Sequence, residues 1–293
     1  MERNFYFDQK AFLGASGSAA TFIEGLQSFT TDWSSPLTDI KANGYGFITD
    51  SEEGFLEGSI GLEKFITSSQ NIFAPLFNST LSGALAYGEQ QSYDEVYAFN
   101  NAYISSYSTS CEVNSLCSES ATLSCFGGLM GVGSTGTTTI PENDIYIAKA
   151  GDIVLSIVNP VDASDRLDLQ DAVQSYDINI DIPRILAPTT MGSNFRQPVE
   201  SIKVDYPIPV SVTIDILVSS YEAPQFVDLV CNKRERNISV TLNDCGTSIR
   251  SFNIGTAKLV SHSTAASVDN NMQMTLSYLR NVTDITDLSS IIQ

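Results

Sequence analysis

The chain has 293 residues, a length that fits up to two domains of ordinary size. Of these residues 42% are hydrophobic, and the mean hydropathy is +0.01, which indicates a folded chain and excludes intrinsic disorder. Its 34 acidic and 15 basic residues give a formal net charge of −19 at pH 7. This charge argues against a protein that grips nucleic acid by its phosphates. A protein past which nucleic acid must slide without binding stays possible.

The sequence predicts neither a membrane span nor secretion. No run approaches the roughly 18 consecutive apolar residues that a spanning helix needs. The first ten residues, MERNFYFDQK, are charged and lack the apolar segment of a secretory signal. The five cysteines are odd in number and show no CxxC spacing, which argues against the disulfide framework of a secreted protein. We therefore expect a product of the cytoplasm.

Most of the predicted elements are short β-strands. Segments rich in Val, Ile, Thr, Tyr and Phe alternate with Gly, Asn, Asp, Ser and Pro at short intervals. The clearest strands are 57–66 and 209–218, in which apolar and polar side chains alternate, although Lys64 takes an apolar position. Helical signals are few, and short helices are predicted within 18–29, 68–78, 164–176 and 221–235.

Four blocks of sequence recur in the same order in the two halves of the chain. Phe99 aligns with Phe252 and Thr122 with Thr275, and two residues are gained before Ala257. We interpret this as an internal duplication, because four weak matches in one order are hard to attribute to chance. The paired blocks are LQSFTTDW (26–33) with VQSYDINI (173–180), GSIGLEKFITSS (58–69) with VSVTIDILVSS (210–220), AFNNAYISSYSTS (98–110) with SFNIGTAKLVSHSTAA (251–266), and ATLSC (121–125) with MTLSY (274–278).

These observations predict a mainly β protein with two tandem, duplicated, β-sandwich-like or barrel-like domains and a few short helices. The segment FGGLMGVGSTGTTTIPEND (126–144) reads as a linker or an exposed hairpin tip. The predicted divisions are a first repeat at 1–126, a Gly/Thr-rich linker or loop at 127–144, a second repeat at 145–285 and a C-terminal tail at 286–293.

Residues that could carry catalysis are scarce. The only histidine, His262, aligns with Tyr107, so we interpret it as a partly buried polar residue of the repeated motif. The linker glycines match GxGxxG, but no helix-forming segment follows them, which favours a flexible loop over a phosphate cradle. The acidic cluster at 50–58 lacks the spacing of a calcium loop. We expect no catalytic residue, no metal site, no cofactor and no enzymatic activity.

In strand pattern, duplication and acidity, residues 26–125 and 173–278 resemble the tail tube proteins of bacteriophages and related contractile machines. The resemblance implies β-sandwich-like domains whose inner strands join around a ring into a large barrel. It implies a homotrimer in which three duplicated chains supply six similar units, and rings that stack into a tube for DNA ejection. The implied location is the virion tail, assembled in the host cytoplasm with other tail proteins as partners.

Under this resemblance Glu57, Glu63 and Asp215 are candidates for acidic side chains that face the lumen, where carboxylates would repel phosphates. The alternative is that they lie on an ordinary exterior sheet face. The linker glycines are candidates for an inter-subunit loop that reaches a neighbouring ring: Gly128, Gly131, Gly133 and Gly136.

Other functions stay open. A neck, tail-terminator or baseplate ring protein, or a capsid decoration protein, could share the duplicated β plan but would form a single ring or stay monomeric. A carbohydrate-binding or adhesin module would use clustered surface aromatics, for which the sequence offers Tyr93, Tyr97, Tyr103 and Tyr107.

Overall fold

The structure is a computed structural model of the whole chain, and it describes most of the residues. They are 9–34, 37–40, 50–53, 57–68, 70–89, 92–126, 130–131, 147–148, 153–162, 164, 166–169, 173–186, 202–217, 235–244, 247–267 and 270–292.

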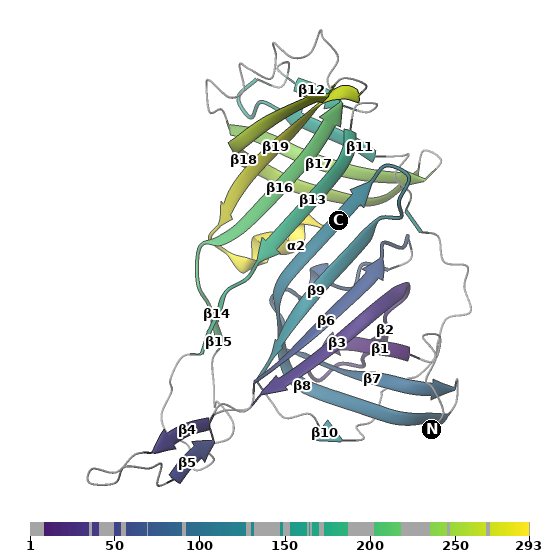
Figure 1. The fold of residues 1–293 in the computed structure, drawn as a ribbon, viewed down its shortest axis with the longest axis vertical. Coiled ribbons are helices and arrows are strands. Elements are labelled where there is room, and N and C mark those ends of the chain that lie inside the picture. The colour runs from purple at the N-terminus through teal and green to yellow at the C-terminus, as the bar shows by residue number, and fades with distance from the viewer. Residues whose placement is uncertain are drawn as a thin grey trace.

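The protein is mainly β, as predicted, and its strands form one large antiparallel sheet with two small separate hairpins (Figure 1). The sheet strands of the first half are β1 (Gln9–Ala15), β2 (Thr21–Phe22), β3 (Leu26–Ser34), β6 (Glu57–Phe65), β7 (Leu81–Glu89), β8 (Ser92–Glu112), β9 (Ser118–Cys125) and β10 (Met130–Gly131). Those of the second half are β11 (Ile153–Val158), β12 (Arg166–Leu169), β13 (Val173–Asp181), β16 (Ile208–Leu217), β17 (Glu235–Asp244), β18 (Thr247–Ser267) and β19 (Asn270–Val282). The two hairpins are β4 (Leu37–Ile40) with β5 (Asp50–Glu53), and β14 (Arg184–Leu186) with β15 (Ile202–Val204).

The two halves share one order of strands. In the first half the pairing runs β3-β6-β9-β8-β7-β1-β2. In the second half it runs β13-β16-β19-β18-β17-β11-β12. The four blocks that recur in the sequence fall on strands in equivalent places in this order. An internal duplication would give this common order, and the duplication itself stays a prediction.

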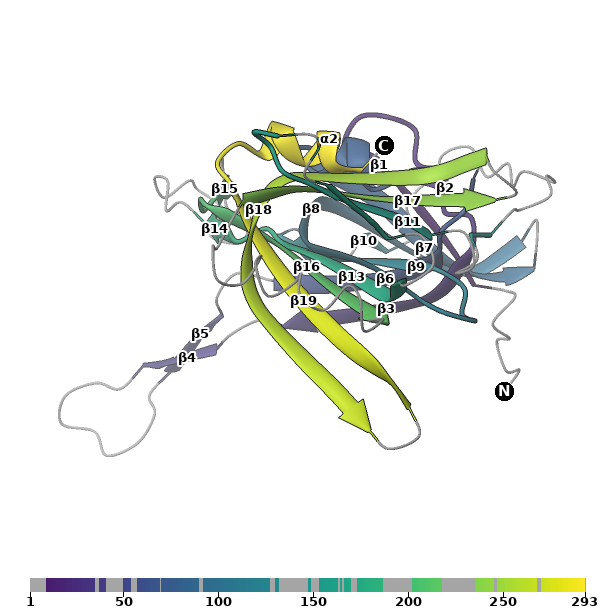
Figure 2. The same cartoon turned by 90° about the horizontal axis from the view of Figure 1, so that it is seen from above.

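The two longest strands, β8 and β18, each have 21 residues and change partner along their length. The first part of β8 pairs with β7 and the second with β9, while β18 passes from β17 to β19. Near each change of partner one residue has a positive φ, Asn101 at 56° in β8 and Gly255 at 70° in β18. These residues bend the strands, so that each half folds into two layers, as Figure 2 shows for β17 and β11 over β16 and β13.

The core lies between the two layers and is continuous through both halves. Alternate side chains of β16 are fully buried, at 0% exposure, from Ile208 to Ile216. The strand predicted at 209–218 therefore has the expected alternation, and so does β6, where Ile60 and Leu62 point inward.

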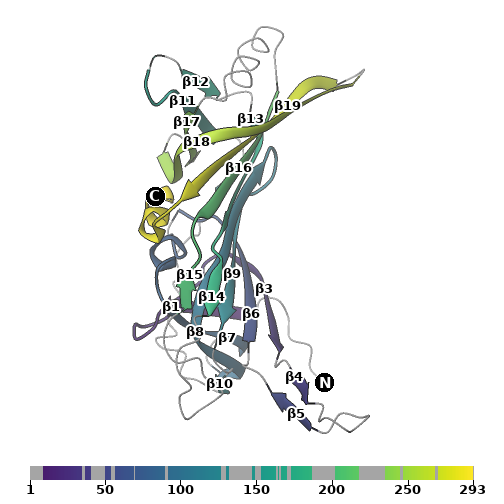
Figure 3. The ribbon, with the colours of Figure 1, turned by 90° about the vertical axis from the view of Figure 1, so that its left-hand side faces the viewer.

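The halves are joined through the sheet itself. Strand β13 pairs along the second part of β8, from Ser106 opposite Asp181 to Glu112 opposite Ser175. Eight strands therefore form one array in the order β3-β6-β9-β8-β13-β16-β19-β18, much of which is seen edge-on in Figure 3. Buried Arg250 of β18 adds a second link, since it donates hydrogen bonds to the carbonyls of Thr67 and Gln70 in the first half.

Helical structure is confined to short turns among the described residues. They are η2 (Ala74–Leu76), η4 (Ile285–Asp287) and α2 (Leu288–Ile291), and α2 packs beside η2. The helix predicted within 68–78 is therefore one 3-10 turn, and that within 221–235 lies almost wholly outside the described residues. The helices predicted within 18–29 and 164–176 are wrong, since those segments contribute to β2, β3, β12 and β13.

The predictions of a C-terminal tail and of a linker can be compared with the structure. The predicted tail at 286–293 includes α2, whose Leu288 and Ile291 are fully buried. The predicted linker at 127–144 lies almost wholly outside the described residues. Within the described part of the chain, no helix has the length and apolar character needed to cross a membrane.

Candidate functional site

The strongest candidate for a functional surface is one broad face of the eight-strand array. Side chains alternate along a strand, and residues directly opposite each other on paired strands lie on the same face. The face opposite the core is therefore defined by the register, and we call it the polar face. Most of its members are Ser28, Thr30, Asp32 and Ser34 of β3; Glu57, Ser59, Gly61 and Glu63 of β6; Ser118, Ser120, Thr122 and Ser124 of β9; Ser106, Ser108, Ser110 and Glu112 of β8; Ser175, Asp177, Asn179 and Asp181 of β13; Ser211, Thr213 and Asp215 of β16; Thr275 and Ser277 of β19; and Ser261 and Ser263 of β18. The register also places Phe65, Tyr103, Leu217, Gln273, Leu279, Ala265 and Lys258 on this face.

The polar face continues across the junction between the halves without interruption. Glu63 lies opposite Ser120, and Ser120 lies opposite Ser108. Ser108 in turn lies opposite Asn179 of the second half, which pairs with Ser211. The side chains along this row are hydroxyl, carboxylate or amide groups, so the sheet presents hydrogen-bonding groups from one half to the other.

Seven residues of the polar face are acidic, and its one basic residue among those described, Lys258 of β18, is paired with Glu235 of β17 at 3.4 Å. All three sequence-predicted acidic residues belong to it, with Glu57 and Glu63 exposed and Asp215 half-buried. Four further carboxylates that the sequence analysis did not single out share the face: Asp32, Glu112, Asp177 and Asp181. The signal for two of them was present, because acidic or polar side chains occupy every second position of β13.

Neighbouring hydroxyls hold two of these carboxylates in place. Ser175 Oγ donates a 2.7 Å hydrogen bond to Asp215, and Thr275 donates to the other oxygen of the same carboxylate. Ser28 Oγ likewise donates to Glu63, at 3.1 Å. In the sequence alignment Ser28 corresponds to Ser175 and Glu63 to Asp215, so the same contact occurs in each half.

Desolvation affects one carboxyl of the face. Partial burial raises the pKa of Asp177 above its ordinary value of 3.8. No lysine or arginine of the polar face lies beside it to offset this effect. The seven carboxylates give the face an excess of negative charge, which disfavours the binding of phosphates.

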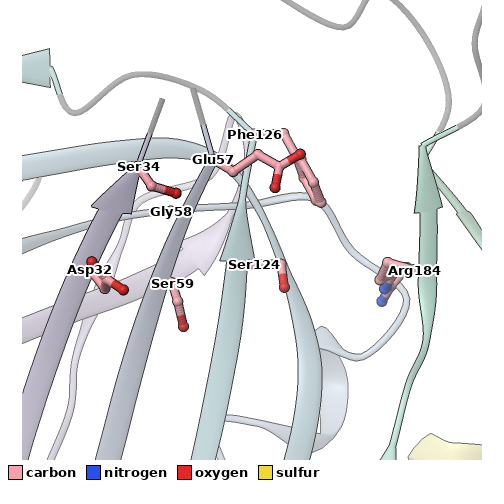
Figure 4. Close-up of a pocket in the computed structure, with 8 residues that line it drawn as sticks. All are labelled: Asp32, Ser34, Glu57, Gly58, Ser59, Ser124, Phe126 and Arg184. Carbon is pink, nitrogen blue, oxygen red and sulfur yellow. The ribbon is translucent and has the colours of Figure 1, made fainter. Parts of the chain in front are cut away.

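A pocket of about 400 Å³ lies at one end of the polar face (Figure 4). Arg184 of β14 stands across it from the strands, and its guanidinium donates to the carbonyls of Ile104 and Phe77 and lies 5.1 Å from the ring centroid of Tyr103. Burial lowers the pKa of Arg184. Its Nε and Nη2 groups are thus held by backbone carbonyls, which fixes the guanidinium at the edge of the pocket. It is lined by Asp32, Ser34, Glu57, Gly58, Ser59, Ser124, Phe126 and Arg184.

The tyrosines considered for sugar binding do not form a shared surface in the described region. Tyr107 is buried and donates a 2.8 Å hydrogen bond to Glu119, whereas Tyr97 is 40% exposed and pairs across from β10. Tyr103 packs at an angle against Phe126. The side chain of Tyr93 lies outside the described residues.

The remaining candidate residues fall in different places. Gly131 lies in β10, opposite Tyr97, while the other three linker glycines, Gly128, Gly133 and Gly136, lie outside the described residues. His262, expected to be partly buried, is exposed on β18. Nowhere in the described part of the chain do three or more His, Cys, Asp or Glu side chains come together in a way that could hold a metal ion.

The cysteines differ from the expectation. Cys111 and Cys117 form a disulfide across the β8–β9 turn, while Cys125 is a buried free thiol. The odd number of cysteines argued against a disulfide framework, but it does not exclude one local bridge. The signal that could have revealed it is the turn at 113–116, which brings the ends of two paired strands together.

No protein-family model matches this chain, and no curated protein matches it.

Proposed function

We propose that the chain is a virion structural protein, a bacteriophage tail tube subunit. Three copies close a ring of six similar units, and rings stack into a tube through which DNA passes without being bound. The proposal assigns the polar face to the lumen, with Glu57, Glu63 and Asp215 among its carboxylates. It assigns the chain no enzymatic activity and no cofactor, and it places the protein in the virion tail after assembly in the host cytoplasm.

One observation carries this proposal: the polar face runs through all eight strands of an array built equally from both halves. A wall for a DNA channel must be broad and must repel phosphates along its length. A face with seven carboxylates, many hydroxyls and a single lysine that is paired with Glu235 has that chemistry. An enzyme or a sugar-binding module would instead gather its functional groups at one place.

The ends of the array support assembly. Strand β3 at one end and part of β18 at the other pair on one side only within the described residues. Open strand edges recruit further strands, and natural proteins cover them or use them. Contact between one edge of a copy and the other edge of the next would be head-to-tail, and such contacts generate rings when the rotation closes.

Negative-stain electron microscopy of the purified protein, with its mass in solution measured in parallel, tests the proposal. The expected images are hollow tubes, or stacked six-lobed rings built from trimers. Closed rings that never stack would contradict the tube and favour a neck, terminator or baseplate ring. A monomer that persists at high concentration would overturn self-assembly and favour a capsid decoration or carbohydrate-binding role.

A further inference from the structure

The array has two free edges, β3 at one end and the last part of β18 at the other. Their counterparts in the other half are β13 and β8, which pair with each other inside the chain. The β3 block aligns with the β13 block at a constant offset, Leu26 with Val173, and the two strands hold equivalent places in their halves. The β18 block aligns in sequence with the β8 block, His262 with Tyr107, and this alignment sets the register used below, although His262 pairs with Leu276 of β19 and Tyr107 with Ala121 of β9. Since β13 pairs along β8 within the chain, β3 is the strand that fits along β18.

We infer that β3 of one protomer pairs antiparallel with the last part of β18 of the next protomer, which puts Trp33 opposite His262. The register is transferred from the internal junction, where Ile180 lies opposite Tyr107 and Ile178 opposite Thr109. The transferred pairs are Ser34 with Ser261, Trp33 with His262, Asp32 with Ser263, Thr31 with Thr264 and Thr30 with Ala265. This inference rests on the proposed self-assembly but not on the passage of DNA.

Burial in the single chain fits this contact. At the internal junction Ile178 is 0% exposed and Thr109 is 1% exposed. Their counterparts at the free edges, Thr31 and Thr264, are both exposed, as is His262. The free edges therefore carry exposed side chains on the face that the internal junction buries, and a neighbouring protomer would cover them.

The chemistry of the opposite face also fits. Asp181 lies opposite Ser106 and Asn179 opposite Ser108 at the internal junction. The transferred register places Ser34 opposite Ser261 and Asp32 opposite Ser263, again hydroxyl and carboxylate groups. The new junction would thus continue the polar face from one protomer to the next, without a basic side chain.

The shape of β18 makes the contact accessible. Figure 2 shows the β18–β19 hairpin extending away from the two layers of its own half, so its outer edge is clear of them. Because β3 and β18 end opposite sides of the array, no chain can pair its own two edges without closing the whole sheet. A second copy is therefore the partner.

A charge pair placed across the inferred junction tests it. Thr31→Lys alone and Thr264→Glu alone each bury an unpaired charge in the contact, so the protein concentration needed for assembly should rise about tenfold or more. The double variant T31K/T264E places opposite charges directly across from each other and should restore assembly. The two positions are exposed, so each variant should keep the circular dichroism spectrum and monomer stability of the parent.

Register is tested by a matched control. Ala265→Glu points to the polar face and should assemble like the parent, and T31K/A265E should not regain assembly, because the two charges lie on opposite faces. Trp33 is the only tryptophan, so its fluorescence reports on β3 alone. Assembly should reduce its quenching by acrylamide in the parent and in T31K/T264E but not in Thr31→Lys.

The outcomes separate this contact from the proposed tube. Rings or oligomers that are lost in the single variants and regained in T31K/T264E support the junction even if no hollow tube forms. Tubes that form equally well from Thr31→Lys and Thr264→Glu would overturn the junction and leave the tube intact. A parent protein that stays monomeric at every concentration overturns both.

Discussion

Lys64 and Glu119 form an ion pair inside the first half, with Nζ 2.9 Å from Oε1 and side chains that are 0% and 1% exposed. Tyr107 donates to the other carboxylate oxygen, and burial together with the Glu119 charge raises the pKa of that tyrosine. This pair explains why a lysine occupies an apolar position of β6. In the alignment Lys64 corresponds to Ile216, which is itself fully buried.

We predict that Lys64→Ile lowers the free energy of unfolding by about 3–5 kcal/mol, because it leaves the Glu119 carboxylate buried without its cation. The double variant K64I/E119M introduces the apolar residues found at the aligned positions 216 and 272, and it should recover most of the loss. Chemical denaturation of the three proteins measures both effects. A single variant within about 1 kcal/mol of the parent would contradict the burial of this pair.

A second prediction concerns the close approach of Trp33 to Gly58. A Cβ atom at position 58 would come within 2.3 Å of the indole ring, so Gly58→Ala must displace the ring. We expect a loss of about 1–3 kcal/mol in stability and a shift in tryptophan emission. Gly61→Ala is the matched control on the same strand, since its Cβ would meet only the Thr30 hydroxyl, which can rotate away. Equal losses in the two variants would contradict the role of the ring.

The disulfide gives a third prediction. The bridge between Cys111 and Cys117 closes a loop with a sequence separation of 6, for which loop-closure entropy gives a stabilisation of about 2 kcal/mol. Denaturation with and without reductant should show this difference, and the C111S/C117S variant should be insensitive to reductant. Peptide mapping after alkylation should find Cys125 unmodified in the folded protein, because burial raises its pKa to about 12. Labelling of Cys125 at native pH would contradict its burial.

Alternation within a strand could be predicted from the sequence, but the partners of each strand could not. Apolar and polar residues alternate along β6 and β16, so the burial of Ile60 and Ile214 and the exposure of Glu63 could be predicted from the local pattern. The pairing of β8 with β7, β9 and β13 depends on contacts distant in the chain. The partner of Lys64 lies on β9, 55 residues away, and no local signal reveals it.

The helices predicted within 18–29 and 164–176 failed for a related reason. Leu169 and Val173 are four residues apart, a helical spacing, but they lie on separate strands, β12 and β13. In 18–29, Gly25 has a φ of 74°, which helical residues do not adopt, and it separates β2 from β3. Whether a short apolar run of this kind forms a helix or a strand depends on its pairing with distant strands, which overrides the local preference for helix.

A fourth prediction follows from the raised pKa of Asp177. The folded chain holds this proton more readily than the unfolded chain, so ionisation of Asp177 lowers stability as the pH rises through its raised pKa. Asp177→Asn should therefore be slightly more stable than the parent at pH 7, by less than about 1 kcal/mol because solvent screens the group. The difference should vanish below the ordinary pKa of aspartate. Thermal unfolding from pH 3 to pH 8 measures it.

Asp284 serves as a control because its pKa is shifted in the opposite direction, downward. The Thr286 amide donates a hydrogen bond to its carboxylate and lowers its pKa. Its contribution to stability is present above the ordinary pKa and is lost as the pH falls through the lowered value. Asp284→Ala should accordingly be less stable than the parent at pH 7 and similar to it at low pH. The same sign for both variants would contradict the assignment of these two shifts.

The last prediction concerns the charge of the polar face. Because this face carries seven carboxylates and a single lysine, Lys258, the assembled parent should not retain double-stranded DNA at physiological salt. E57K/E63K places two cations on exposed positions of β6 and should create retention that weakens steeply as salt rises. D205K/D287K makes the same change in net charge at exposed positions outside the face and should not create it. A gel-shift titration at several salt concentrations compares the three proteins, and equal retention by both variants would show that net charge, rather than the polar face, governs contact with DNA.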